Sequence, residues 1–279
     1  MLVFSVNGKA ENDERFDTKV FFTKMVQELT KKFLNIASIY FLENTGRADI
    51  VTGNPILIFG KSSISADLLG LSFEIQPKSF FQVNTLGAEK LYAEVIRFIR
   101  FKVDASTGSP DIRNLTNLLP YKPFTLLDLY AGTGTIGILL SKYFDRVYSV
   151  ELVPDASADG VKNAERNGIT NVQFICKKVE VLAQEWKESN KKADTIVIDP
   201  PRDGMHPDTL PSILSFDARE IIYVSCNPAT LARDLEVLVG KTRDEEMQKL
   251  PRYRITDIAP MDMFPHTHHI ETVVRLELI

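Results

Sequence analysis

From Thr125 onward, short apolar runs alternate with amphipathic helical patterns, and this alternation is the strongest constraint on the fold. Strands are predicted at 125–130, 147–151, 172–176, 194–199 and 220–225, with helices starting near residues 135, 154, 179, 207 and 228. Strands joined through helices need right-handed crossovers, which predicts a largely parallel sheet with helices on both faces. The pattern changes at 254–258 and 271–278, which indicate two strands joined by a loop alone. We therefore expect an antiparallel pair at the C-terminal edge of the sheet.

The first part of the chain predicts a smaller α+β domain. Asp17 can cap a helix whose apolar residues recur at helical spacing, and strand candidates follow at 36–42, 56–59 and 71–75. A further helix is predicted after Asn84. The run from Ala105 to Pro110 is rich in turn-forming residues and marks a break. We expect a small domain over 1–105, a linker over 106–122 and a large domain over 123–279.

Composition favours a cytoplasmic globular protein. Apolar residues make up 44% and charged residues 25% of the chain. No apolar run reaches the roughly 20 residues of a membrane helix, and Asn7, Lys9 and Glu11 interrupt any signal peptide. A net charge of −4 argues against nonspecific coating of nucleic acid but allows a local basic face.

No metal or iron–sulfur cluster is expected. Cys176 and Cys226 are the only cysteines, too few for a four-cysteine zinc site or a cluster. His266, His268 and His269 have no carboxylate or thiolate partner at a recognisable metal-ligand spacing.

A glycine-rich loop follows the first strand of the large domain, in the run Asp128-Leu129-Tyr130-Ala131-Gly132-Thr133-Gly134. Its glycines allow a tight turn and close approach to a ligand. An acid at Asp128 is poorly placed beside a pyrophosphate and suits a cation, such as the ammonium end of S-adenosylmethionine. Glu151 ends the second strand and can accept hydrogen bonds from both ribose hydroxyls, in this cofactor or in a dinucleotide. With the antiparallel ending, the pattern is typical of a Rossmann-like class I methyltransferase.

Two motifs stand at the ends of neighbouring predicted strands. Asp199 begins Asp-Pro-Pro-Arg, and Cys226 lies within Ser-Cys-Asn-Pro. If Asn227 caps a helix and Pro228 is its first residue, the helix N-terminus favours the thiolate of Cys226. These residues predict a nucleophile and an acceptor pocket at the ends of two strands of one sheet.

With these motifs, the chain resembles the RNA uracil-5-methyltransferase family, which methylates C5 of a uridine in tRNA or rRNA. The resemblance rests on 79–85, the glycine-rich loop, the two strand-end motifs and 262–271, and extends from about residue 70 to the end. It implies S-adenosylmethionine as cofactor and an RNA-facing first domain. It also implies roles for individual residues: cofactor contacts from Gln82, Tyr130, Glu151 and Asp199, with Thr135 where the family often has another polar residue, Cys226 as nucleophile, and Glu271 as base.

The chemistry of C5 methylation independently needs such groups. Uracil C5 is too weak a nucleophile to attack a methyl sulfonium, so a thiolate first adds to C6 and makes the ring an enolate. A base must then remove the C5 proton before the thiol can leave, and a carboxylate is sufficient. Asp199 can accept a hydrogen bond from uracil N3–H or from the cofactor.

Two departures from the family are visible. The chain has no room for the family's N-terminal RNA-binding β-barrel, which we expect to mean a fragment or a minimal form. Lys178 stands where an acid or amide often meets the adenine amino group, and its ammonium cannot accept that hydrogen bond. We therefore expect the backbone to recognise adenine.

Other functions remain open from the sequence. An amino-group methyltransferase would use Asp-Pro-Pro to hold an exocyclic amine and would not need Cys226. A noncatalytic RNA-binding or RNA-folding protein could keep the same fold. A dinucleotide dehydrogenase is a more distant alternative.

Overall fold

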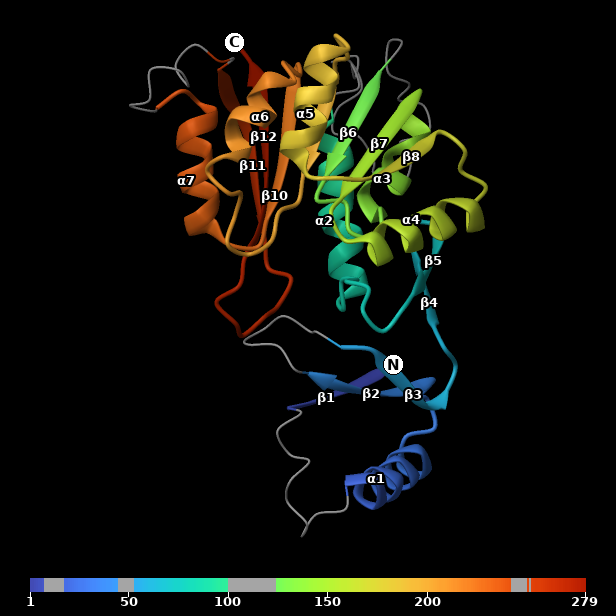
Figure 1. The fold of residues 1–279 in the computed structure, drawn as a ribbon. Coiled ribbons are helices and arrows are strands. Elements are labelled where there is room, and N and C mark those ends of the chain that lie inside the picture. The colour runs from blue at the N-terminus through green and yellow to red at the C-terminus, as the bar shows by residue number, and fades with distance from the viewer. Residues whose placement is uncertain (8–17, 45–52, 100–123, 242–249, 251) are drawn as a thin grey trace. The chain divides into compact units, whose positions relative to one another are not determined.

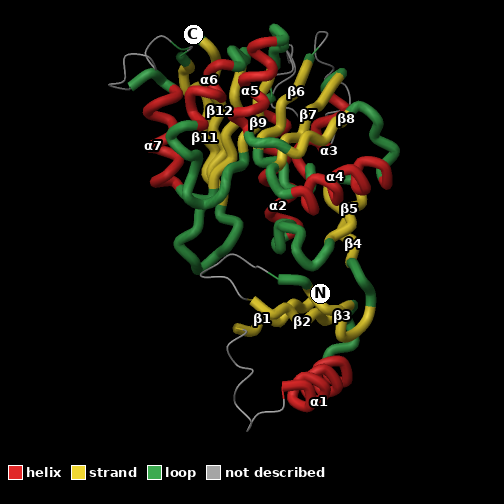
Figure 2. The backbone as a smooth tube through the Cα atoms, viewed as in Figure 1, coloured by secondary structure: helices red, strands yellow, loops and turns green. Residues whose placement is uncertain are grey.

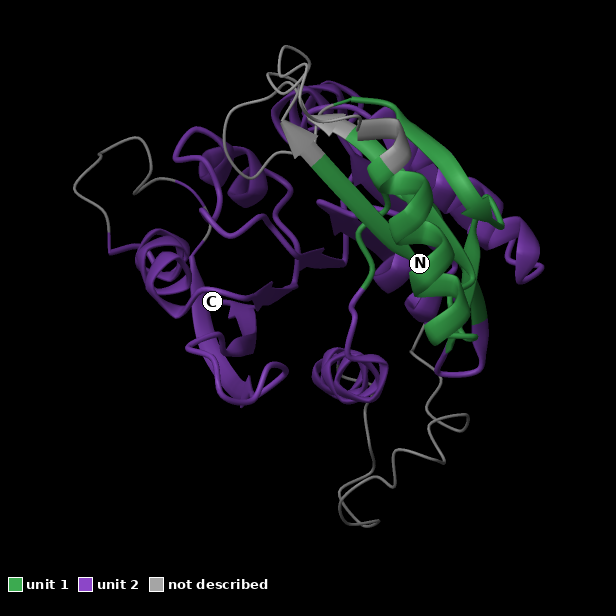
Figure 3. Cartoon of the chain, turned by 90° about the horizontal axis from the view of Figure 1, so that it is seen from below, with its two compact units in different colours: residues 1–67, 72–81 green, residues 68–71, 82–279 purple. Residues whose placement is uncertain are grey.

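The computed structural model describes residues 1–7, 18–44, 53–99, 124–241, 250 and 252–279. By its internal contacts the chain forms two compact units, one of residues 1–67 and 72–81 and one of residues 68–71 and 82–279 (Figure 3). The expected linker at 106–122 lies outside the described residues, so the division expected from the sequence stays a prediction.

The larger unit is built on a seven-stranded sheet with strand order β11-β12-β10-β9-β6-β7-β8 (Figure 1). Its strands are β6 (Thr125–Leu129), β7 (Arg146–Glu151), β8 (Val172–Cys176), β9 (Thr195–Ile198), β10 (Glu220–Ser225), β11 (Tyr253–Met261) and β12 (Glu271–Leu278). The strands from β8 to β10 pair in parallel, while β12 is antiparallel to both β10 and β11. The predicted Rossmann-like sheet, mostly parallel with an antiparallel C-terminal edge, is confirmed.

Helices pack on both faces of this sheet (Figure 2). They are α2 (Thr85–Phe98), α3 (Thr135–Leu140) with the following 3-10 turn η3 (Ser141–Tyr143), α4 (Pro154–Arg166), α5 (Val179–Glu188), α6 (Thr209–Ser215) and α7 (Pro228–Leu238). One face forms a continuous core with α5, α6 and α7, in which Trp186 packs edge-on against Tyr148 and Phe216. Because side chains alternate along a strand, the other residues of β6, β7 and β10 point toward α2, α3 and α4.

The smaller unit contains a three-stranded sheet of β1 (Leu2–Asn7), β2 (Ser38–Asn44) and β3 (Pro55–Gly60). The central β2 runs parallel to β1 and antiparallel to β3. Helix α1 (Thr18–Lys32) contributes Phe22. The centroid of its ring lies 4.9 Å from the ring centroid of Phe41 and 6.3 Å from that of Phe4. The predicted cap at Asp17 lies outside the described residues. Strand β1 was absent from the sequence prediction.

A short hairpin of β4 (Ile64–Leu68) and β5 (Leu71–Ile75) connects the sheet of the smaller unit to the segment that leads into α2. Leu69 and Gly70 form its two-residue turn with φ of 49° and 83°. Positive φ at both turn residues matches the twist of the flanking strands. Strand β5 was predicted, whereas β4 was not.

Candidate active site

The glycine-rich loop joins β6 to α3 through three residues with positive φ, namely Tyr130 at 60°, Gly132 at 54° and Gly134 at 74°. A Cβ built on Gly134 would lie 2.4 Å from the ring of Phe174, so only glycine fits beside that ring. A Cβ on Gly132 would meet nothing within 4 Å. The loop therefore packs tightly on its β8 side and leaves open space beside Gly132.

Asp128 lies buried near the end of β6, beneath this loop. Its Oδ2 accepts hydrogen bonds of 3.0 Å from the backbone N–H of Gly137 and from the Ser149 hydroxyl. Its Oδ1 has no partner among the described residues. Burial raises the pKa of Asp128 to about 7, and the neighbouring Glu151 carboxylate adds to that increase. Oδ2 thus stabilises the first turn of α3, while Oδ1 is an acceptor without a partner among the described residues. Contact of Oδ1 with a cofactor stays a prediction.

Glu151 ends β7 and binds the loop with both carboxylate oxygens. Oε2 accepts the N–H of Gly132 at 2.8 Å, and Oε1 accepts the N–H of Val153 at 2.8 Å. Each oxygen keeps a second lone pair, so the carboxylate can still accept two hydroxyl donors beside the open space at Gly132.

Tyr130 and Thr135 contact protein groups at the two ends of the loop. The pKa of Tyr130 is raised by burial and by Glu180, and the Thr209 hydroxyl partly offsets this increase. Thr209 also donates to Glu180, which links the loop to α5 and α6. Thr135 is buried with its hydroxyl 3.4 Å from that of Thr133. Cofactor contacts from Tyr130 and Thr135 stay predictions.

Three candidate site residues stand at one edge of the sheet, namely the two candidate catalytic residues and the candidate cofactor contact Asp199. Cys226 directly follows β10, Asp199 follows β9, and Glu271 begins β12. Strand β10 pairs with both neighbours, and its last residue Ser225 lies opposite Thr272. Since Cys226 and Glu271 are the adjoining residues on those two strands, the register brings them side by side.

The predicted helix cap beside Cys226 is confirmed, but its effect on the thiol is not. The Asn227 side chain accepts the N–H of Ala229 at 3.1 Å, and Pro228 is the first residue of α7. The pKa of Cys226 is nevertheless raised, first by burial and then by the carboxylates of Glu271 and Asp199. Burial and the two acidic neighbours outweigh the helix N-terminus, so Cys226 favours the protonated thiol.

The carboxyl groups of Asp199 and Glu271 are also shifted toward their neutral forms. Burial raises the pKa of Asp199 to about 8, with further contributions from Glu271 and Asp128. Burial alone raises the pKa of Glu271, whose side chain is 4% exposed. Within the described ranges, no hydrogen bond reaches either carboxyl group. Unpaired carboxyl groups at such depth are available to a ligand.

The segment before α2 contributes Gln82 and Asn84. The Asn84 side chain caps α2 by accepting the N–H of Gly87 at 3.0 Å, and its amide donates to the carbonyl of Met263 at 2.9 Å. Met263 lies in the connection from β11 to β12, shortly before Glu271. Gln82 is 8% exposed, and its amide has no partner in the described part of the chain. Its cofactor role stays a prediction.

Tyr92 was missed by the sequence reasoning. It lies on the buried face of α2, 6% exposed, and its pKa is raised by burial and by the carboxylates of Asp199, Glu271 and Asp128. Its phenol group is thus within electrostatic range of all three carboxyl groups. The sequence did contain one signal for it. Tyr92 lies on the apolar face of a predicted helix, and a buried tyrosine hydroxyl needs a polar neighbour.

His268 and His269 contact Arg202. Its Nη2 lies 2.7 Å from Nδ1 of His269 and 3.5 Å from Nε2 of His268. Across the described ranges, no group of three or more histidine, cysteine, aspartate or glutamate side chains could hold a metal ion.

Lys178 is exposed at the N-cap of α5 without a side-chain capping bond. None of the helices in the described ranges is long and apolar enough to cross a membrane.

The family model of tRNA (uracil-5-)-methyltransferases matches residues 116–279. The chain belongs to this family. An RNA methyltransferase of Clostridium tetani, described as uncharacterized, is 38% identical over 91% of this chain and 49% of its own length. A counterpart from Listeria monocytogenes is 34% identical over 99% of this chain and 52% of its own length. The chain thus spans about half the length of the curated relatives it matches.

One solved structure agrees with this family assignment, and a second shares the fold. The tRNA (uracil-54, C5)-methyltransferase of Pyrococcus abyssi, solved with S-adenosyl-L-homocysteine, is 30% identical with a TM-score of 0.63, over 88% of this chain and 52% of that chain. A SAM-dependent methyltransferase of Agrobacterium tumefaciens is 15% identical with a TM-score of 0.52, over 88% of this chain and 79% of that one. The second likeness reflects the fold alone.

Proposed function

We propose that the chain methylates C5 of a uridine in a folded tRNA or rRNA, using S-adenosylmethionine and a covalent bond from Cys226 to uracil C6. The observation that carries this proposal is the convergence of Cys226 with Asp199 and Glu271 at the ends of β9, β10 and β12. Membership of the uracil-5-methyltransferase family supports the same reaction.

The loop residues fit the proposed cofactor. Asp128 Oδ1 is a buried acceptor without a partner among the described residues, and the space beside Gly132 is open. Glu151 would accept the ribose hydroxyls, while Gln82 and Asp199 would contact the reactive end. When bound, S-adenosylmethionine supplies an electrophilic methyl group next to the carboxyl ends of the strands.

Cys226 begins the reaction by losing its proton to the ionised carboxylate of Asp199, because a raised pKa makes that carboxylate a stronger base. A sulfur electron pair then forms the bond to C6, and the C5=C6 electron pair moves toward O4, so that C5 becomes nucleophilic. After C5 has gained its methyl group, Glu271 takes the remaining C5 proton. The electrons of that C–H bond restore C5=C6 and expel the Cys226 thiolate.

The substrate base must leave its stack, because C5 and C6 of a stacked uracil are out of reach of a thiol at a strand end. A loop uridine meets this requirement at the lowest cost. We therefore expect folded RNA with an accessible loop uridine to be methylated faster than a continuous duplex or free uridine.

The test is methyl transfer to RNA from cells lacking the protein, followed by mass analysis of the nucleosides. We expect 5-methyluridine with the wild type and none with Cys226→Ala. Cys176→Ala is the matched control, because Cys176 is an exposed cysteine at the end of β8. Methylated amino groups, or activity that survives in Cys226→Ala, would favour the amino-group methyltransferase. RNA binding without methyl transfer would favour a noncatalytic protein.

A further inference from the structure

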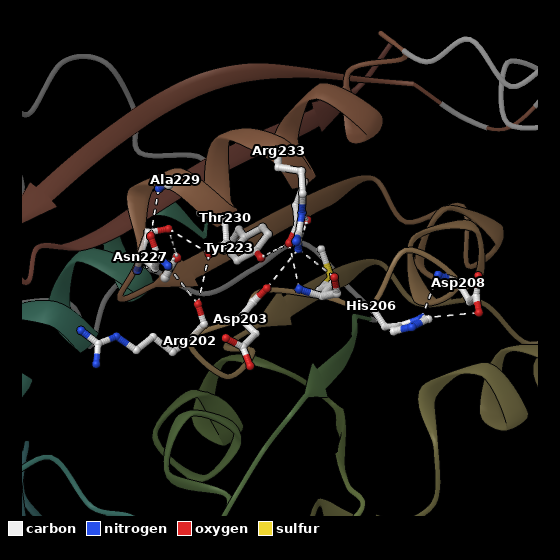
Figure 4. Close-up of polar contacts among 12 residues, drawn as sticks. Arg202, Asp203, His206, Asp208, Tyr223, Asn227, Ala229, Thr230 and Arg233 are labelled. Carbon is white, nitrogen blue, oxygen red and sulfur yellow. Dashed lines mark hydrogen bonds and ion pairs between the residues drawn. The ribbon is translucent and has the colours of Figure 1, made fainter. Parts of the chain in front are cut away.

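The segment 202–205, which follows the Asp-Pro-Pro run, is bound to the first turns of α7 through its backbone (Figure 4). At its start, the carbonyl of Arg202 accepts hydrogen bonds from the Asn227 amide at 3.2 Å and from the Thr230 hydroxyl at 3.3 Å. Asn227 is also the cap of α7. The cap residue next to Cys226 therefore also holds the segment that follows Asp199.

The other end of the segment is held by Arg233 and Asp234. Nη2 of Arg233 donates to the carbonyls of Asp203 at 3.1 Å and Met205 at 2.9 Å. Asp234 is fully buried; its Oδ2 accepts the N–H of Met205 at 2.9 Å and the hydroxyl of Tyr223 at 2.7 Å, and its Oδ1 accepts from Arg233 at 2.9 Å. A buried carboxylate is retained at low cost only when its oxygens are satisfied in this way. We call these two residues the Arg233–Asp234 clamp.

Gly204 shows how closely the segment approaches the clamp. A Cβ on Gly204 would lie 2.6 Å from Nη2 of Arg233 and 2.8 Å from Oδ2 of Asp234. Its φ of 74° also disfavours a side chain. The backbone therefore rests directly on the two charged groups, which leaves little freedom for the segment to shift.

The clamp connects the two motifs that carry the chemistry. Asp199 is joined to the clamped segment by Pro200 and Pro201, which restrict backbone rotation. Cys226 precedes the first turn of the helix that carries the clamp. We propose that Arg233 and Asp234 are positioning residues that fix Asp199 relative to Cys226, and with it the approach of the thiol to C6. This inference rests on the proposed function and adds residues that touch neither substrate nor cofactor.

The test measures covalent adduct formation with labelled RNA carrying 5-fluorouridine, in the presence of S-adenosylmethionine and at saturating RNA, on a denaturing gel. Fluorine at C5 cannot leave as a cation, so the adduct accumulates. For Asp234→Asn we expect the rate of adduct formation to fall about tenfold or more, because misplacement by about 1 Å is enough for such a loss. Calorimetry with S-adenosylhomocysteine should show a smaller change than the rate does, since Glu151 and Gly132 lie outside the clamp and only the contact from Asp199 is displaced.

Arg233→Lys is the second variant, and its side chain is 49% exposed, which limits any effect on folding. A lysine cannot form the bonds to Asp203, Met205 and Asp234 together, so we expect a smaller decrease in the same rate. Glu220→Gln is the matched control. It removes a carboxylate that pairs with Arg275 at 3.1 Å at the opposite end of β10, so it should lower the melting temperature without slowing adduct formation.

Each outcome bears on one of the two proposals. A wild-type protein that forms no adduct contradicts the proposed function. Wild-type rates in both Asp234→Asn and Arg233→Lys, with adduct formed by the wild type, contradict the positioning role alone. The positioning role also fails if Glu220→Gln slows adduct formation as much as Asp234→Asn does.

Discussion

The side-chain amide of Asn84 donates a hydrogen bond of 2.9 Å to the backbone carbonyl of Met263, across 179 positions of the chain. The same side chain caps α2, the helix that carries Tyr92. One residue thus ties the segment of Gln82 to the connection that leads to Glu271.

Substitutions at Asn84 can separate these two contacts. Asn84→Ala loses both, and we expect it to lower the free energy of unfolding by about 1–3 kcal/mol. Asn84→Asp keeps an acceptor for the Gly87 N–H but loses the donor to Met263. We expect Asn84→Asp to retain most of the stability and to slow methyl transfer. Denaturant unfolding and turnover with RNA check this prediction, and wild-type turnover in Asn84→Asp would contradict it.

A second prediction concerns the pH dependence of cofactor binding. With pKa values of about 8 for Asp199 and about 7 for Asp128, both carboxyl groups bind protons near neutral pH in the free protein. A sulfonium favours ionised carboxylates, so binding of S-adenosylmethionine should release protons. Its affinity should then rise from pH 6 to pH 8, by up to about tenfold per pH unit for each proton released. Calorimetry in buffers of different ionisation enthalpy counts these protons, and Asp199→Asn should release fewer.

The same pKa shift predicts an effect on stability. The folded protein holds a proton on Asp199 up to a pH of about 8, whereas the same carboxyl group in the unfolded chain loses it near its ordinary pKa of 3.8. Between these values the folded state binds more protons, so the free energy of unfolding falls as the pH rises. Asp199→Asn removes this dependence and should be more stable than the wild type at pH 8, by about 1–3 kcal/mol. Thermal unfolding at pH 5 and pH 8 checks it; equal differences at both pH values would contradict the shift.

Local patterns in the sequence were enough to predict most of the large sheet. Each parallel strand was a short apolar run, and Asn227 with Pro228 marked the start of α7 correctly. Strand β1 was missed because its evidence is its pairing with β2, which lies more than thirty residues away. The direction of the Cys226 shift was missed for a similar reason. The shift comes first from burial in the folded protein and then from carboxyl groups beside two other strands, and the local sequence Ser-Cys-Asn-Pro shows neither.

The hydrogen-bond partners of Asp128 and Asp234 could not be predicted from the sequence. The expected ligand contact of Asp128 stays a prediction, and the sequence did not show that its Oδ2 also binds Gly137 and Ser149. Asp234 carried no motif of its own, although it is fully buried and bonded to the segment after Asp199. A buried carboxylate becomes recognisable only once its donors are in place.

Substitution of Gly134 should mainly lower stability, whereas substitution of Gly132 should mainly weaken cofactor binding. Gly134→Ala combines a φ of 74° with a Cβ 2.4 Å from Phe174, so we expect a loss of about 2–4 kcal/mol of stability. Gly132→Ala has open space and should lose about 1–2 kcal/mol through backbone strain alone. The added methyl group should instead weaken binding of S-adenosylhomocysteine. Melting curves and calorimetry on both variants check this contrast, and equal loss of stability would contradict it.

The last prediction tests the order in which Cys226 and Glu271 act: Cys226 forms its bond to C6 first, and Glu271 removes the C5 proton last. Glu271→Gln keeps the size of this buried side chain but cannot take the C5 proton. The thiol can still add to C6 and the methyl group can still join C5, so a methylated covalent adduct should accumulate on ordinary uridine RNA.

A denaturing gel with labelled RNA detects this adduct as a shifted band. Cys226→Ala, alone or combined with Glu271→Gln, should give no shifted band, because the S–C6 bond cannot form. Normal turnover in Glu271→Gln would mean that another group removes the proton, and Asp199 would then be the next carboxylate to substitute. A shifted band that persists in the double variant would mean that Cys226 is not the nucleophile.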